Sequence, residues 1–71
     1  MALQVEVYLQ ALSLIKEYGK HAPFYAACKA DEMRDAGNLY ERRTWRRVAE
    51  TIEEMLAREA AARATAQLHI H

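Results

Sequence analysis

The residues best suited to chemistry in this sequence form an arginine-rich run. Residues 41–47 read Glu-Arg-Arg-Thr-Trp-Arg-Arg, so four guanidinium groups and an indole ring fall within about two helical turns. Guanidinium groups bind carboxylates and phosphates, so an acidic protein surface or a nucleic-acid backbone would suit them. We favour a solvated face, on which Asp31 and Asp35 of the preceding helix pair with these arginines. The arginines are Arg42, Arg43, Arg46 and Arg47.

No other group of residues indicates catalysis or metal binding. The serine, threonine and histidine residues follow no nucleophile-elbow, phosphate-loop or paired-carboxylate pattern. His69 and His71 could join His21 and Cys28 at a metal ion, but no Cys-x-x-Cys or His-x-x-x-His spacing supports such a site. Cys28 is predicted to be a small, half-buried residue. We therefore predict no enzyme activity, no catalytic residue, no cofactor and no metal ion.

Composition and charge narrow the function classes further. Ten basic residues balance ten acidic residues, and this zero net charge argues against a general nucleic-acid or membrane binder. A lone cysteine, no basic leader and no apolar run of about 20 residues predict a cytoplasmic protein outside membranes. Abundant alanine, with two glycines and one proline, favours helix over sheet.

Three helices are needed to position these residues. They are predicted at about residues 3–18, 23–36 and 39–60, with a frayed tail to residue 71, and they make one domain over residues 1–71. The very short turn at Gly37–Asn38 makes the second and third helices antiparallel neighbours. The predicted fold class is therefore all-α, a small three-helix bundle with short turns that is able to dimerise.

The helix ends follow from residues with special backbone or capping properties. Gly19 and Gly37 suit the left-handed conformation that ends a helix, and Pro23 suits a first helical turn. Asn38, with Glu41 three residues later, is an asparagine variant of the capping box. These signals set the boundaries of the second and third helices.

Helical periodicity predicts which side chains face inwards. The apolar arc of the first helix covers more than half of its circumference, which is more than a small bundle needs. Val7 and Leu14 widen this arc, and we expect them to form part of an interaction patch. The inner stripes are predicted to be Val5, Tyr8, Leu12 and Ile15 in the first helix; Ala26, Ala30 and Met33, helped by Phe24 and Ala27, in the second; and Trp45, Val48, Ile52 and Met55, beside Ala49 and Leu56, in the third.

A wider pattern covers about residues 9–56. It consists of Tyr18-Gly19, Ala22, residues 26–33, Gly37-Asn38, Trp45, Val48, Ile52 and Leu56. This pattern resembles a family of short, uncharacterised, all-helical bacterial proteins, in which a Gly-Asn turn precedes a tryptophan and an aliphatic stripe. The alanine-rich tail after Arg58 departs from that pattern. The resemblance implies a helical fold but no activity, so no functional residue is carried over from it.

The predicted function is a small helical protein–protein interaction module without catalytic activity. Its partner is another protein or a second copy of the chain, and a homodimer is the simplest form. An adaptor, or an inhibitor that blocks a surface, would fit this description. The alternative is a nucleic-acid-associated regulator that uses the arginine-rich start of the third helix, although the Gly37–Asn38 turn is shorter than that of a helix-turn-helix. The predicted interaction patch consists of Val7, Leu14, Arg42, Arg43, Arg46 and Arg47.

Overall fold

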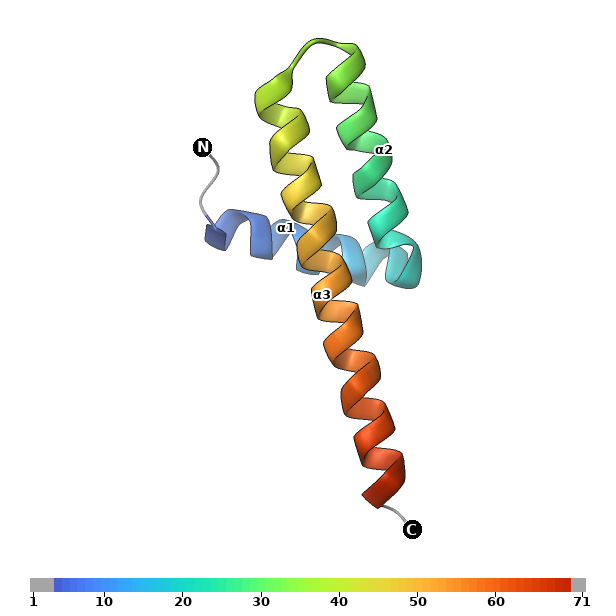
Figure 1. The fold of residues 1–71 in the computed structure, drawn as a ribbon. Coiled ribbons are helices and arrows are strands. Elements are labelled where there is room, and N and C mark those ends of the chain that lie inside the picture. The colour runs from blue at the N-terminus through green and yellow to red at the C-terminus, as the bar shows by residue number, and fades with distance from the viewer. Residues whose placement is uncertain (1–3, 70–71) are drawn as a thin grey trace.

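The computed structural model describes residues 4–69, and it describes side chains for residues 4–66. In chain order the elements are α1 (Gln4–Tyr18), the 3₁₀ turn η1 (Gly19–His21), α2 (Ala22–Asp35) and α3 (Leu39–His69). Figure 1 shows α2 and α3 side by side and antiparallel, with α1 crossing α3 at a steep angle. The molecule is elongated, with extents of 53 × 21 × 16 Å.

The all-α class is confirmed, but the prediction of a three-helix bundle was wrong. The chain is helical from residue 4 to residue 35, so it forms a hairpin of two helical segments, the first of which bends at η1. Gly19 was predicted to end the first helix. The α1 segment does end at Tyr18, and Gly19 follows it with a positive φ of 58°, but the chain continues directly into η1, where the Ala22 N–H donates to the Gly19 carbonyl as α2 begins. The α1 segment therefore joins α2 through a 3₁₀ turn, without an intervening loop.

The turn between α2 and α3 forms as its sequence predicts. Gly37 adopts a left-handed φ of 77°. The Asn38 N–H donates to the Met33 carbonyl at 2.8 Å and the Gly37 N–H donates to the Arg34 carbonyl at 3.0 Å, which is the Schellman arrangement. The Glu41 N–H donates to Asn38 Oδ1 at 3.1 Å, so the predicted N-cap of α3 is confirmed.

Small residues let α2 lie close to its neighbours. Ala22, Ala26 and Ala30 are buried along one face of α2, and α3 contributes the fully buried side chains of Val48 and Ile52. Trp45, Ala49, Met55 and Leu56 pack around this core, which confirms the predicted inner face of α3. Phe24, in contrast, is 74% exposed and Ala27 is exposed, so the inward positions predicted for them were wrong. Cys28 was predicted to be half-buried, but it is exposed as well.

The inner face predicted for α1 was wrong at three of its four positions, whereas Ile15 packs against the core as predicted. Val7, Ala11 and Leu14 are the buried residues of this helix, whereas Val5, Tyr8 and Leu12 of the predicted stripe are exposed. Ala11 is completely buried in the middle of the inner face, where its short side chain permits a close approach of the backbones. The helix is therefore rotated so that its smaller apolar face meets the core.

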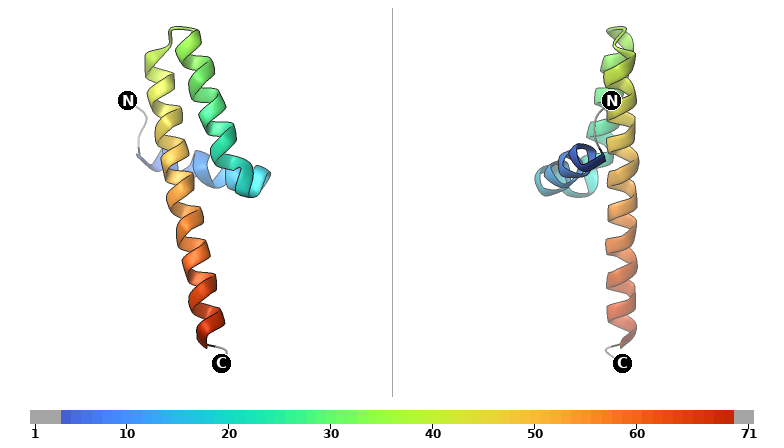
Figure 2. Two further views of the ribbon diagram at one scale, coloured as in Figure 1. Left: turned by 45° about the vertical axis from the view of Figure 1, so that its right-hand side comes forward. Right: turned by 90° about the vertical axis from the view of Figure 1, so that its left-hand side faces the viewer.

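Beyond its contact with α1, α3 continues as an unaccompanied helix (Figures 1 and 2). We call the segment from residue 57 to residue 69 the projecting arm; its residues 57–66 are all exposed. The helix thus runs past the predicted end at about residue 60, while residues 70–71 of the predicted tail lie outside the described residues. Within residues 4–69, no helix combines the length and the apolar character needed to span a membrane.

Candidate interaction surface

The apolar part of the predicted interaction patch lies inside the molecule. Val7 is 7% exposed and Leu14 is 4% exposed, and both belong to the core cluster. These two side chains already pack in the core, so neither offers a substantial exposed apolar surface to a partner. This corrects the assignment of Val7 and Leu14 to an exposed patch.

The four arginines at the start of α3 do not form a single surface. Arg42 is half-buried, whereas Arg43, Arg46 and Arg47 are exposed. Arg42 and Arg46 line a groove between α2 and α3, but Arg47 lines a hollow between α1 and α3. At about 100° per residue, the pair Arg43 and Arg47 is turned about 100° from the pair Arg42 and Arg46. A ligand must therefore reach around the helix to contact all four guanidinium groups.

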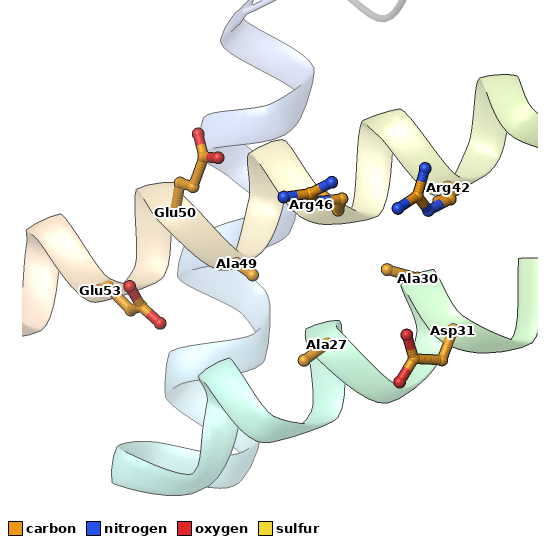
Figure 3. A pocket seen from close by; sticks show the side chains of 8 residues that line it. All are labelled: Ala27, Ala30, Asp31, Arg42, Arg46, Ala49, Glu50 and Glu53. Carbon is orange, nitrogen blue, oxygen red and sulfur yellow. The ribbon is translucent and has the colours of Figure 1, made fainter. Parts of the chain in front are cut away.

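The groove between α2 and α3 has a volume of about 330 Å³ and carries mixed charge (Figure 3). Figure 3 shows α1 passing behind the two helices, so the groove opens on the opposite side of the hairpin. Two guanidinium groups and three carboxylates line it, which leaves a formal charge of 2 − 3 = −1. Such a groove is poorly suited to a phosphate backbone. Its lining residues are Ala27, Ala30, Asp31, Arg42, Arg46, Ala49, Glu50 and Glu53.

The ion pairs predicted across the hairpin do not form. Asp31 Oδ1 lies 3.6 Å from Arg34 Nη1, and Asp35 Oδ1 lies 3.4 Å from Arg34 Nε, so both carboxylates pair within α2. In the described part of the chain, the guanidinium groups of Arg42, Arg43, Arg46 and Arg47 form no ion pair or hydrogen bond. The prediction of direct ion pairs with these arginines was therefore wrong, although Asp31 does line the same groove as Arg42 and Arg46.

The largest apolar feature on the surface of α1 is a second stripe, which we call the α1 outer stripe. The exposed fractions of its side chains are 58% for Val5, 46% for Tyr8, 59% for Leu9 and 42% for Leu12. Their i, i+3, i+4, i+7 spacing makes one continuous face. At about 100° per residue, this face lies about 140° around the helix from the buried face of Val7, Ala11 and Leu14.

Two hollows, one on each side of α1, show which way the α1 outer stripe faces relative to α3. On one side, Glu6 and Gln10 face Glu41 and Trp45 near the start of α3, across a hollow of about 180 Å³. On the other side, Tyr8 lies with Met55 and Arg58 around a hollow of about 220 Å³. The α1 outer stripe therefore turns away from the core and towards the side of α1 from which the projecting arm leaves. Sequence reasoning missed Leu9, although the width of the apolar arc was the signal that could have identified it.

An aromatic cluster connects the bend to α3. The rings of Tyr18 and Tyr25 stack with centroids 4.6 Å apart, and Tyr25 meets Trp45 edge-on at 6.2 Å. Lys29 Nζ lies 5.7 Å from the Tyr25 centroid, and its 3.3 Å ion pair with Glu32 raises the pKa of Lys29. Partial desolvation, followed by the Glu17 carboxylate, raises the pKa of Tyr18. Such contacts between residues of α1, α2 and α3 fix the angle of α1.

The described residues hold no group of three side chains that could bind a metal ion. His21 and Cys28 are both exposed. His71 and the side chain of His69 lie outside the described residues, so the structure does not test whether these two histidines bind a metal ion.

The resemblance to a family of short bacterial helical proteins stays a prediction. In comparisons with known proteins, no family model, no curated protein and no solved structure matches this chain.

Proposed function

We propose that this protein is a helical protein–protein interaction module that binds through the α1 outer stripe. A single observation carries the proposal: α1 is apolar on two nearly opposite faces, and the described residues of the chain cover only one of them. Burying an exposed Val or Leu side chain contributes about 1.5–3 kcal/mol, so a partner that covers this stripe gains substantial free energy. The function is to occupy or connect protein surfaces, without a catalytic step.

The small core supports the same proposal. Among the described residues, Val48 and Ile52 are the largest side chains that are fully buried, and alanines supply much of the remaining core. Chains of this size gain little net free energy from folding alone, because conformational entropy nearly cancels the hydrophobic gain. A partner that buries the α1 outer stripe would therefore stabilise the fold as well as form a complex.

The alternative is a nucleic-acid-associated regulator, and the exposed, unpaired guanidinium groups of Arg43, Arg46 and Arg47 favour it. The carboxylates in the groove beside Arg46 oppose it. Arg43→Ala combined with Arg47→Ala would weaken phosphate binding and reduce its dependence on salt. An electrophoretic mobility shift assay at low salt tests this alternative, which is rejected if the unaltered protein produces no shift.

Site-specific photo-crosslinking tests the proposed function. Benzoylphenylalanine replaces Tyr8 in the α1 outer stripe, and the control carries it at Gln10, on the polar side of α1. We expect the probe at position 8, in purified protein or in native lysate, to give one adduct of defined mass that Leu9→Glu abolishes. Leu9 is exposed, so this substitution leaves the core unchanged, which circular dichroism verifies. Equal labelling at positions 8 and 10, or no adduct at either position, contradicts the proposal.

A further inference from the structure

From the α1 outer stripe and the projecting arm, we infer that the partner of this surface is a second copy of the chain. The two α1 helices lie antiparallel, stripe against stripe, and the projecting arm of each copy covers α1 of the other. This inference rests on the proposed function, because it uses the same surface and names its occupant. Spacing, arm geometry and charge each support it.

The spacing of the α1 outer stripe matches itself under a twofold rotation. Its members are separated by three, one and three residues, which is the same sequence of intervals in both directions. An antiparallel pairing therefore sets Val5 against Leu12 of the second copy and Tyr8 against Leu9 of the second copy. Every apolar side chain of the stripe then meets an apolar side chain, as an isologous interface requires.

The projecting arm is long enough to pack across one additional helix. From residue 57 to residue 69 the arm rises about 20 Å at 1.5 Å per residue, while a helix with its side chains is about 10–12 Å wide. The arm therefore extends far enough beyond α1 to cross a second helix laid beside it. Tyr8 of the α1 outer stripe lines the hollow that this second helix would border.

The side chains of the arm also suit a close approach. The inner face of α3, which includes Val48, Ile52 and Met55, continues at the same three- and four-residue spacing to Glu59, Ala62 and Ala66. Ala62 and Ala66 are exposed, and their methyl groups let another helix come near. Glu59 forms an ion pair with Arg63 on the arm itself, so its carboxylate is already compensated.

Charge and area agree with a second copy as the occupant. The chain has zero net charge, so two copies meet without long-range repulsion. A standard interface buries about 800 Å² on each partner, and four partly exposed side chains supply less than that. The stripe alone is therefore too small, and the projecting arm supplies the additional contact area.

The first experiment measures mass as a function of concentration by sedimentation equilibrium. We expect the unaltered chain to approach twice 8.2 kDa, and Leu9→Glu and Ala62→Glu each to raise the dimer dissociation constant at least about tenfold. Ala64→Glu is the matched control, because at about 100° per residue position 64 lies about 160° around the arm from position 62. Equal effects of Ala62→Glu and Ala64→Glu would overturn the role given to the arm.

The second experiment tests the antiparallel pairing through disulfide formation, in a Cys28→Ser background that removes the exposed native thiol. A mixture of Val5→Cys and Leu12→Cys chains is expected to cross-link under mild oxidation, whereas each variant alone is not. Cross-linking of Val5→Cys chains with each other would indicate a parallel pairing and overturn the inference.

The two proposals fail in different ways. A chain that stays monomeric at every concentration, yet gives a position-8 adduct with a different protein, overturns the second-copy inference and supports the proposed interaction module. A monomeric chain without any position-8 adduct contradicts both proposals.

Discussion

The two parts of α3, residues 39–56 (the packed half) and the projecting arm, belong to one continuous helix but are stabilised by different interactions. In residues 39–56, Val48 and Ile52 are almost completely enclosed by α1 and α2. In the projecting arm, residues 57–66 are all exposed, and the stabilising contacts are local. They include the Glu59–Arg63 ion pair and the 3.0 Å hydrogen bond that Thr65 Oγ1 donates to the Ala61 carbonyl.

This difference separates the two sources of helix stability. The packed half is held by buried apolar surface, whereas the arm depends on alanine propensity and i, i+4 pairs. A free helix of the arm's length is marginal in water because its first turn is costly to form, but the packed half supplies a preformed turn from which the arm continues. The arm is therefore the part of α3 that opens most easily.

Ile52→Ala gives the largest expected effect, because this side chain is 0% exposed in the packed half. The lost transfer free energy and the cavity should lower the free energy of unfolding by about 2–5 kcal/mol. Urea denaturation followed by circular dichroism measures this change. A loss below about 1 kcal/mol would show that the packed half is not held by its core.

Asn38→Ala tests the start of the packed half. It removes the side-chain oxygen that accepts from the Glu41 N–H at 3.1 Å, so the free energy of unfolding should fall by about 1 kcal/mol. The same urea titration measures it, and Asn38→Asp, which keeps an accepting oxygen, is the control. If the alanine and aspartate variants are equally stable, the cap does not stabilise α3.

Ala60→Gly tests the arm, where the side chain at position 60 is exposed. Glycine should destabilise the local helix by about 1 kcal/mol without opening the core, because propensity is the main source of stability here. Amide hydrogen exchange measured by NMR should accelerate about fivefold in residues 60–66 and stay constant around Ile52. Equal acceleration at both places would mean that the two halves of α3 open together.

Glu59→Gln gives the smallest expected effect. Loss of the exposed ion pair with Arg63 should cost about 0.2–0.5 kcal/mol of local helix stability. Carbon chemical shifts of residues 59–66 measure the change in helicity, and added salt should reduce the difference between variant and unaltered protein. A difference that is unchanged in high salt would assign the effect to side-chain propensity and not to charge.

Much of the local structure could be predicted from short stretches of the sequence. The left-handed turn at Gly37, the N-cap at Asn38 and the inner positions of Val48 and Ile52 depend on neighbours within a few positions along the chain. The candidate site could be predicted only in outline. The excess of apolar residues on the first helix was visible, but the patch was placed on Val7 and Leu14, which are buried, and Leu9 was left out of it.

The sequence by itself determined that the chain is helical, where α3 begins, and that the apolar residues of the first helix cover more than half of its circumference. Only the tertiary structure decided which of the two apolar faces of α1 is buried. Both faces have helical spacing, so periodicity cannot distinguish them. The steep crossing favours the face that has Ala11 at its centre, because a small side chain there lets the helices approach closely. The larger Tyr8, Leu9 and Leu12 consequently remain exposed.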